Sequence, residues 1–371
     1  MSAFDQSWHS IHIYYYDVNK DALLLDCVRP LIATLYKRGW ADRSYFTRHW
    51  QGGSHLRLHV HADHALFESE IAPCVVGEVE AYLYEHPSGG SFTSEEAVRQ
   101  YQRRSNMTLE QLAYVAPVPN NSLHLAPYRQ PVGIGSPELA CFLEDYYGET
   151  TDLAFTIIEQ TRNDYRGRLN ACFDQLVAFV AAGSLIPLAG AYMSYRSHAE
   201  AYIVCEPDVE EPRLRRRRFE RAFHERHDAV MRRITFLLDA LNAAPERLAN
   251  WLPPLIALHR RYGEKALQGV LEGSFRLNGN SHSREYRLSA SDFHAAVATN
   301  LAVKQHQNSP YVLAQRIVLN FLYLHLSRLG LLNEDRYLLD YYIAGGIEEL
   351  CHISPVDVIR NFKGFAPGTP S

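Results

Sequence analysis

Hydrophobic and polar positions alternate near the start of the chain, where residues 55–61 read HLRLHVH. Side chains in a strand point to opposite faces in turn, so the apolar residues share one face and the imidazole and guanidinium groups share the other. Residues 45–61 predict two such strands joined by the polar turn Gln51–Ser54. The polar face is either solvated or the floor of a site for an anionic or strongly polar ligand. Its members in the second strand are His55, Arg57, His59 and His61.

Further elements follow from the spacing of apolar residues around these strands. Residues 8–16 (WHSIHIYYY) are rich in aromatic and β-branched residues and predict a strand that pairs with the one beginning at Tyr45. Residues 21–37 and 65–85 carry apolar residues at helical spacing. The order strand, helix, strand, strand, helix indicates an α+β fold.

The remainder of the chain is predicted to be mainly helical. Residues 115–137 hold five prolines, so they predict a long loop or a short edge pairing, and residues 189–204 suit either a helix or a strand. We expect one unit over residues 1–371, with a small antiparallel or mixed sheet in 1–135 and a mainly helical part in 136–371. Helical periodicity marks residues 137–147, 151–159, 169–182, 212–241, 245–261, 264–271, 291–301, 311–329 and 334–350.

Composition narrows the class of protein. A hydrophobic fraction of 47% and an aromatic fraction of 12% are typical of a folded globular chain. A net charge of −5 and an isoelectric point near 6.4 argue against a nucleic-acid partner. The first residues, MSAFDQSWHS, lack the basic and apolar regions of a signal peptide. We therefore expect a cytoplasmic protein without a membrane partner.

The motifs of common cofactor and nucleophile sites are missing from the sequence. It contains no GxxxxGK[ST], GxGxxG or GxSxG motif, and its cysteines form no CxxC pair. His59 and His61 have the spacing of a strand metal site, but Arg57 on the same face would repel a cation. We expect neither metal nor cofactor, so that any chemistry would depend on acids, bases and positioning.

Two further polar clusters lie in otherwise apolar segments. The segment 192–202 (YMSYRSHAEAY) holds the first, whose members are Tyr195, Arg196, Ser197, His198 and Glu200. In the second, Arg316, Asn320 and Tyr323 follow each other at spacings of four and three and would share one face of a helix. Each cluster is either a functional site or a hydrogen-bonded part of the core.

The predicted helix 212–241 begins with the basic run RLRRRRFERAFHERH. Its apolar period places Leu214 and Ala222 among the inward-facing residues. Such a run is commonly a solvated face with local acidic partners. The alternative is a docking surface for an acidic peptide, formed by Arg215, Arg216, Arg217 and Arg218.

These stretches resemble a known family. The opening WHSIHIYYY followed by YFTRHWQGGSHLRLHVH is similar to the FFIRYWDxGPHLRLR signature of the C-terminal elimination domain of class I lantibiotic dehydratases. LNFLYLHLSRLGLLNEDRYLL resembles the end of that domain, and the resemblance runs from about Trp8 to Glu349. It implies a free-standing version of the elimination domain, with an α+β fold.

Departures from the eliminating pattern favour another branch of this superfamily. The second arginine of HLRLR is His59 here. Eliminating members carry a Glu and an Arg ahead of Tyr-Gly-Gly, and in the matching region, residues 129–135, neither is in place. Aligning Arg328 with the arginine of their HMxxNR motif puts Tyr323 at the histidine position and Ser327 at the asparagine position. In these respects the chain resembles the thiopeptide pyridine synthases, which perform a formal [4+2] aza-cycloaddition.

The resemblance implies a precursor peptide as substrate, with an acidic leader segment and azoles in its core. The hypothesis is that two dehydroalanines are joined into a nitrogen heterocycle, with Tyr323 and His198 donating protons and with Ser197 and Tyr195 aiding orientation. Substrate would be held by Arg57, His55, His59, Arg196, Glu200, Asn320 and Arg316. Other maturation enzymes are possible partners. The alternatives are a lyase that eliminates glutamate from glutamylated serine and a non-catalytic scaffold that binds the precursor.

Overall fold

The structure is a computed structural model that describes residues 6–105, 114–205, 211–278 and 291–363. Backbone contacts divide the chain into two compact units. We call residues 1–168 with 324–330 the sheet unit, and residues 169–323 with 331–371 the helical unit. The expectation that the chain acts as a single unit stays a prediction.

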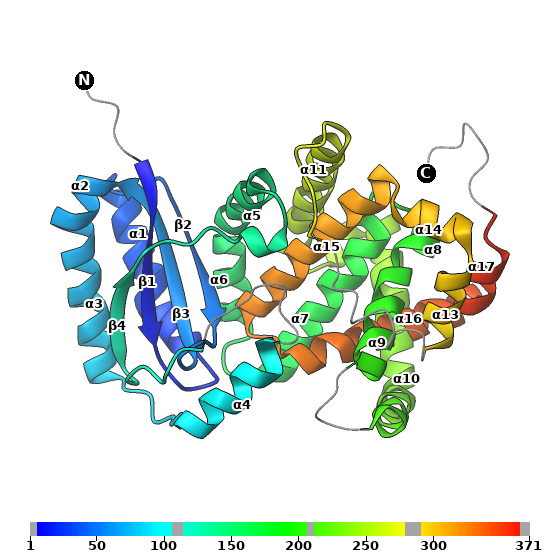
Figure 1. Cartoon of the computed structure of the whole chain (residues 1–371), viewed down its shortest axis with the longest axis horizontal. Helices are drawn as coiled ribbons and strands as arrows, with labels where there is room; N and C mark the ends of the chain where they lie inside the picture. Colours follow the sequence, from blue (N-terminus) through cyan, green and yellow to red (C-terminus); the bar gives the residue numbers. More distant parts are fainter. Residues whose placement is uncertain (1–5, 106–113, 206–210, 279–290, 364–371) are drawn as a thin grey trace. The chain divides into compact units, whose positions relative to one another are not determined.

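The sheet unit contains a four-stranded antiparallel sheet with strand order β2-β3-β1-β4 (Figure 1). The predicted pairing of the first strand with the strand that begins at Tyr45 is wrong, because β3 lies between them. Its strands are β1 (Gln6–Tyr14), β2 (Arg43–His49), β3 (His55–Asp63) and β4 (Ser122–Ala126). The short strand β4 pairs with the outer edge of β1, which is the edge pairing expected within the proline-rich segment. The turn between β2 and β3 requires Gly53, because its φ of 120° is unfavourable for other residues and a side chain there would collide with Tyr16.

Helices cover the apolar face of the sheet. Leu56, Leu58 and Val60 of β3 are fully buried, as are Ile11 and Ile13 of β1. The covering helices lie on one side of the strands in Figure 1 and include α1 (Arg29–Lys37), α2 (His64–Leu66) and α3 (Ala72–Glu85). Short π-helical segments, Leu23–Val28 and Phe67–Ile71, lead into α1 and α3. The hydrophobic effect therefore fixes which strand face remains for polar groups.

The remaining helices include most of those that periodicity predicts, and the α+β fold class is confirmed. The segment 189–204 lies in two helices, residues 188–191 and 193–205, which decides between the two expectations in favour of helix. Helices α4, α14 and α17 were not predicted. The helices after the first strands are α4 (Ser94–Ser105), α5 (Pro137–Glu149), α6 (Thr151–Gln160), α7 (Tyr165–Ala178), α8 (Leu188–Ala191), α9 (Met193–Cys205), α10 (Pro212–Ala243), α11 (Leu252–Leu271), α13 (Asp292–Thr299), α14 (Leu301–Gln307), α15 (Pro310–Leu329), α16 (Asn333–Cys351) and α17 (Pro355–Asn361).

One predicted pair of helices is wrong. Residues 252–271 form the single helix α11, and residues 245–247 form only a 3-10 turn. The helix continues through Gly263, where Leu185 packs so closely that an added Cβ would stand 3.1 Å from its side chain. The glycine that weakens the helical pattern in sequence thus serves a close contact within the helical unit.

The inward face of α10 differs from the prediction at its first turns. Leu214 is 51% exposed, whereas Arg215 is fully buried. The Arg215 guanidinium donates to the carbonyl oxygens of Tyr202 and Ile203 at 2.9 and 2.8 Å, near the end of α9. These carbonyls belong to the last turn of a helix, which leaves acceptors without partners inside the helix. A charged side chain therefore replaces an apolar one at this position of the core.

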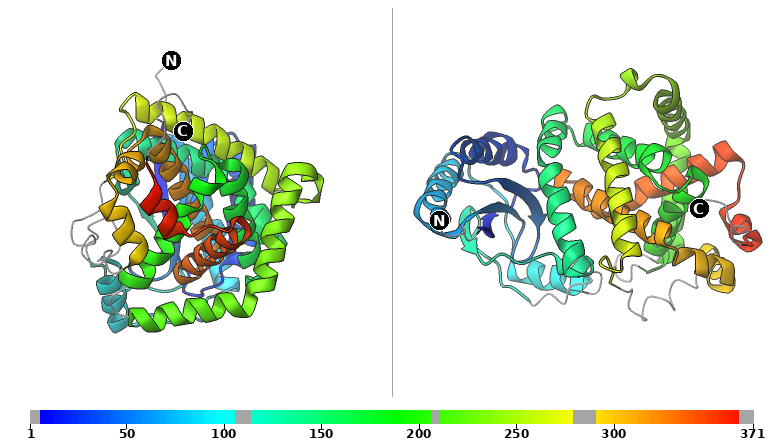
Figure 2. Two further views of the ribbon diagram at one scale, coloured as in Figure 1. Left: turned by 90° about the vertical axis from the view of Figure 1, so that its right-hand side faces the viewer. Right: turned by 90° about the horizontal axis from the view of Figure 1, so that it is seen from above.

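Helix α16 packs against both α9 and α10 in the helical unit (Figure 1 and Figure 2). Gly346 allows α10 to approach, because an added Cβ would collide with Ile234. This packing places the α16 side chains beside the polar cluster of α9. Among the described helices, none is long and apolar enough to cross a membrane.

Candidate functional site

The polar face of the sheet is a continuous array of basic and aromatic side chains within the sheet unit. The strand register pairs Arg57 with His12 of β1 and Thr47 of β2, and pairs His59 with Ser10 and Tyr45. The predicted common face of the β3 residues is confirmed by this register. Histidines on this face are His12, His49, His55, His59, His61 and His124.

Two imidazoles hold the guanidinium of Arg57. Its Nε donates to Nε2 of His55 at 3.1 Å, and its Nη2 lies 3.0 Å from Nδ1 of His49. His55 Nδ1 lies 2.8 Å from the carbonyl oxygen of Gly53 and must donate to it, since its other ring nitrogen accepts from Arg57. These contacts fix His55 as one neutral tautomer and fix the direction of the guanidinium.

The buried histidines of this face are neutral at physiological pH. Burial, opposed by the bond to Gly53 and reinforced by nearby Arg57, lowers the pKa of His55 to about 3. Burial and Arg57 lower the pKa of His12 to about 4. Burial also lowers the pKa of His59, followed by the charge of Arg57. Arg57 is therefore a cation set among neutral rings, a suitable partner for carbonyl oxygens or an oxyanion.

A tyrosine pair and a carboxylate lie on the same face and were missed by sequence reasoning. Tyr128 donates to Glu144 Oε1 at 2.5 Å, and the hydroxyls of Tyr45 and Tyr128 are 2.9 Å apart. The His59 ring lies against both tyrosine rings, and its Nδ1 has no hydrogen-bond partner in the described part of the chain. Burial raises the pKa of Glu144, which is on α5. No spacing in the sequence connects this helix with the strands.

The helical unit brings together the two residues predicted to donate protons. The Tyr323 hydroxyl on α15 lies 2.9 Å from Nδ1 of His198 on α9. The same hydroxyl lies 3.1 Å from each carboxylate oxygen of Asp340 on α16. Sequence reasoning missed Asp340, although it directly follows the segment 319–339 that resembles the end of the family's domain. Three helices thus contribute one side chain each to a hydrogen-bonded chain.

Burial and a neighbouring charge set the pKa of Asp340 in this cluster. Asp340 is fully buried and Tyr323 is 8% exposed. Burial raises the pKa of Asp340 to about 7, although the positive charge of Arg336 and the bond from Tyr323 act in the opposite direction. The Arg336 guanidinium lies 3.8 Å from the Asp340 carboxylate and 4.3 Å from the centre of the Tyr323 ring. A carboxyl group with such a pKa can exchange a proton near neutral pH.

Other predicted members of the site have structural partners. Tyr195 is fully buried and donates to the Leu176 carbonyl at 2.8 Å, so its hydroxyl is not available to orient a substrate. Ser197 Oγ lies 3.1 Å from Nε2 of His294. Arg316 and Asn320 are half-buried and precede Tyr323 on α15. Their roles in substrate binding stay predictions.

Arg196 and Glu200 belong to a chain of ion pairs. Arg196 binds Glu348 through two bonds of 2.8 and 2.5 Å. Glu200 binds Arg216 through two bonds of 3.0 and 2.6 Å and also accepts from Ser291 at 2.9 Å. A substrate carbonyl would have to compete with the half-buried Glu348 carboxylate for Arg196, whose role in substrate binding stays a prediction.

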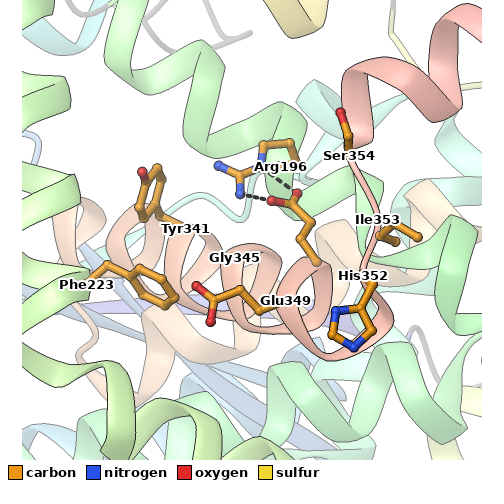
Figure 3. Close-up of a pocket in the computed structure, with 9 residues that line it drawn as sticks. Arg196, Phe223, Tyr341, Gly345, Glu349, His352, Ile353 and Ser354 are labelled. Atoms are coloured by element: carbon orange, nitrogen blue, oxygen red, sulfur yellow. Dashed lines mark hydrogen bonds and ion pairs between the residues drawn. The ribbon is translucent and has the colours of Figure 1, made fainter.

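A groove of about 670 Å³ lies beside this ion-pair chain (Figure 3). The side chains of Phe223 and Tyr341 stand at one end, and His352, Ile353 and Ser354 lie at the other. Gly345 lies between the ends and keeps the groove open, because an added Cβ would stand 3.2 Å from the Phe223 ring. Its size suits a small ligand or a short peptide segment.

The basic run on α10 is not a uniform surface. Arg215 is buried, so including it in an exposed docking surface is wrong. Arg216 is bound to Glu200, and Arg218 forms an ion pair with Glu334. Arg217 is exposed. The exposed arginines that follow each other at four-residue spacing are Arg213, Arg217 and Arg221.

Metal binding has no structural support in the described residues, where no group of three or more histidine, cysteine, aspartate or glutamate side chains is placed to hold an ion. His61 Nδ1 instead lies 2.7 Å from Asp42, and His59 is enclosed by tyrosine rings. The two histidines of the HxH pair therefore have separate partners.

Comparison with known proteins shows the family of the chain. Among curated proteins, none matches the chain significantly in sequence. Its fold is similar to that of TbtD, a pyridine synthase from thiomuracin biosynthesis, with a TM-score of 0.74 and 25% identity over 94% of this chain and 99% of TbtD. It is also similar to that of TsrL, with a TM-score of 0.75 and 20% identity over 97% of this chain and 100% of TsrL. Residues 8–345 match the family described as lantibiotic biosynthesis dehydratase C-term. The chain therefore belongs to the lantibiotic dehydratase C-terminal family.

Proposed function

We propose that this protein is an enzyme of thiopeptide maturation that joins two dehydroalanines of an azole-modified precursor peptide. The reaction is a formal [4+2] aza-cycloaddition, followed by loss of water and of the leader peptide. The observation that carries the proposal is the likeness to a pyridine synthase over almost the whole of both chains, at 25% identity. The hydrogen-bonded Tyr323 and His198 add the acid and base that the reaction needs.

Proton transfers define what the site must do. One dehydroalanine and its preceding amide tautomerise to an iminol, which moves a proton from nitrogen to oxygen and creates a 2-azadiene. The second dehydroalanine adds across this diene, and holding both ends together supplies much of the rate enhancement through lowered entropy cost. Loss of water and loss of the leader as an amide then make the ring aromatic, and both leaving groups must be protonated. Tyr323 and His198 are suited to these transfers.

The sheet face is the candidate for holding the peptide backbone. Arg57 presents a guanidinium whose direction is fixed by its bond to His55. The His55 imidazole is neutral, so Arg57 supplies the positive charge at this point of the face. Guanidinium donors stabilise carbonyl oxygen as it gains charge. In this proposal Arg57, His55 and His59 bind the core of the precursor.

Leader recognition is assigned to the exposed arginines of α10. Arg213, Arg217 and Arg221 lie one turn apart and form a row of positive charge. A peptide with carboxylates on one side would match this row, with an attraction that weakens as salt is added. This row replaces the Arg215 to Arg218 set expected from the sequence.

The test is mass spectrometry of the purified protein incubated with a precursor that contains dehydroalanines and azoles. Loss of water together with the intact leader amide would establish pyridine formation. Loss of glutamate from a glutamylated peptide would instead assign the protein to the eliminating branch. Binding with no change in mass under either condition would favour a scaffold.

A further inference from the structure

The number of hydrogens available around the Tyr323 hydroxyl limits how this residue can bond to its neighbours. A tyrosine hydroxyl has one hydrogen, yet this oxygen lies within hydrogen-bond distance of both Asp340 oxygens and of His198 Nδ1. It can donate to only one of these neighbours at a time. The other neighbour must then donate to the tyrosine oxygen.

Within these contacts, two arrangements of the hydrogens satisfy Asp340, Tyr323 and His198 while the imidazole is neutral. When Asp340 carries a proton, it donates to Tyr323, Tyr323 donates to His198 Nδ1, and the imidazole hydrogen is on Nε2. When Asp340 is ionised, Tyr323 donates to the carboxylate, and His198 must donate from Nδ1. The protonation of Asp340 therefore selects the tautomer of His198.

We propose that Asp340, Tyr323 and His198 form a proton relay in which buried Asp340 is the proton reservoir and His198 Nε2 is the atom that exchanges protons with the substrate. The proposal rests on the proposed function only for the identity of the substrate. Exposure follows the same order, because Asp340 is fully buried, Tyr323 is 8% exposed and His198 is half-buried. Tyr323 is then a conduit, which revises the expectation that it protonates the substrate directly.

The relay is balanced. His198 gives its Nε2 proton to the substrate, Nδ1 takes the Tyr323 proton, and Tyr323 takes the Asp340 proton. One N–H and two O–H bonds break, while one N–H bond, one O–H bond and one bond to the substrate form. The final state is the second arrangement, with ionised Asp340 and a hydrogen on Nδ1. Accepting a proton from the substrate or solvent at Nε2 restores the first arrangement.

The groups around Asp340 support its role as a reservoir. Helix α9 contributes His198 and Tyr195, α15 contributes Tyr323, and α16 itself contributes Arg336 at 3.8 Å. Helix α10 meets α16 further along, where His227 binds Glu349 at 2.7 Å. Burial outweighs the attraction of Arg336 and raises the pKa of Asp340 to about 7. Both hydrogen arrangements are therefore accessible near neutral pH.

The first test reads the tautomer directly and needs no substrate. Two-bond proton–nitrogen correlation spectra of protein labelled with ¹⁵N-histidine distinguish Nδ1–H from Nε2–H, and His198→Gln identifies the signal. The relay predicts that His198 changes from Nε2–H to Nδ1–H as the pH rises through about 7. In Asp340→Asn the side chain no longer titrates, so the tautomer of His198 should stay the same across this pH range. A wild-type His198 with one tautomer throughout would overturn the relay.

The second test uses single-turnover rates once a substrate is established. Asp340→Asn should slow turnover about 10- to 100-fold and remove the fall in rate above neutral pH, since the amide cannot supply a proton. The double variant with His198→Gln should be no slower than His198→Gln alone. Asp174→Asn, which alters another buried carboxylate of the helical unit that binds Arg233, is the matched control. If Asp340→Asn keeps the wild-type rate and pH profile while His198→Gln is inactive, the relay is wrong and the proposed function stands.

Asp340→Asn must also be shown to fold. Should it fail to fold, Tyr323→Phe provides the same tautomer test, because it removes the connecting hydroxyl and makes His198 independent of Asp340. A pH-dependent tautomer change that survives in Tyr323→Phe would contradict the proposal.

Discussion

The sheet face and the helical cluster both place ionisable groups in buried surroundings, but burial has opposite uses in them. On the sheet, burial beside Arg57 keeps His12 and His55 neutral, with pKa values of about 4 and 3. In the helical cluster, burial moves Asp340 to a pKa of about 7. Desolvation disfavours the charged form in each case. The imidazoles thereby lose their ability to titrate near neutral pH, and the carboxyl group gains it.

The comparison suggests a separation of tasks. A set of groups that does not change charge provides constant electrostatics for binding, whereas a group with a pKa near 7 suits proton exchange. We therefore expect substitutions in the helical cluster to affect turnover and substitutions on the sheet face to affect binding. Four experiments test this separation.

The largest effect is expected from removing the members of the relay that lie nearest the substrate. Tyr323→Phe and His198→Gln should each lower single-turnover rates roughly 10²- to 10⁴-fold, the usual contribution of general acid–base catalysis. Precursor affinity, measured by fluorescence anisotropy, should change little. Tyr342→Phe is the matched control, since Tyr342 is also buried in the helical unit and donates to a single carbonyl, that of Ala222. Equal losses of affinity and rate would break the proposed separation.

The next effect concerns stability. The pKa of Asp340 is about 7 in the folded protein, whereas the ordinary value for an aspartate is 3.8. The folded protein therefore holds this proton more tightly than the unfolded chain does. The stabilising contribution is complete below about pH 4 and is lost as the pH rises through about 7. The contribution is on the order of a few kcal/mol. In urea unfolding, Asp340→Asn should gain stability relative to wild type as the pH rises over this range, and a constant difference would contradict the prediction.

A smaller effect is expected on the sheet face. Arg57→Ala removes donors to His55 and His49 together with the proposed contacts to the peptide. We expect affinity for the precursor core to fall roughly 10- to 100-fold, the range for losing a charged hydrogen bond. Arg57→Lys should recover only part of this, because an ammonium cannot reproduce the fork of a guanidinium. Normal affinity with a collapsed rate would move Arg57 into the chemical step.

The smallest effect is expected for the leader peptide. Replacing Arg213, Arg217 and Arg221 together by Glu should weaken leader binding about tenfold at low salt, with the difference shrinking at high salt. A triple variant with the same change in charge, made at the exposed Arg38, Arg232 and Arg360, controls for net charge. Equal weakening in both variants would show attraction by overall charge without a defined row.

Periodicity predicted elements well where one face had to be buried. Strand β3 alternates in the sequence and in the sheet, because a shift of one residue would expose Leu56 and bury Arg57. Prediction failed where a close contact overruled the local signal. Two helices were predicted over residues 245–261 and 264–271, yet residues 252–271 form the single helix α11. Arg215 is buried where the apolar period pointed to Leu214.

In the candidate site, too, some residues were identified from local sequence patterns and others were missed. Tyr323 and His198 were identified from their polarity within apolar segments, and the family resemblance supported Tyr323 by alignment with a motif. Asp340 was not identified, because an aspartate in the middle of a helix is usually exposed and no spacing relates it to α9 or α15. Glu144 was missed in the same way, since its partner Tyr128 follows the short strand β4.

The sequence by itself determined the α+β class, the polar face of the sheet, the family and two members of the helical cluster, because these depend on periodicity and on local motifs. Only the tertiary structure decided that Asp340 meets Tyr323, that Arg196 is bound to Glu348 and that Arg215 lies in the core. These facts depend on how helices distant in sequence pack together. Packing sets burial and partners, and burial and partners decide whether a charged residue stabilises the fold, binds a ligand or exchanges a proton.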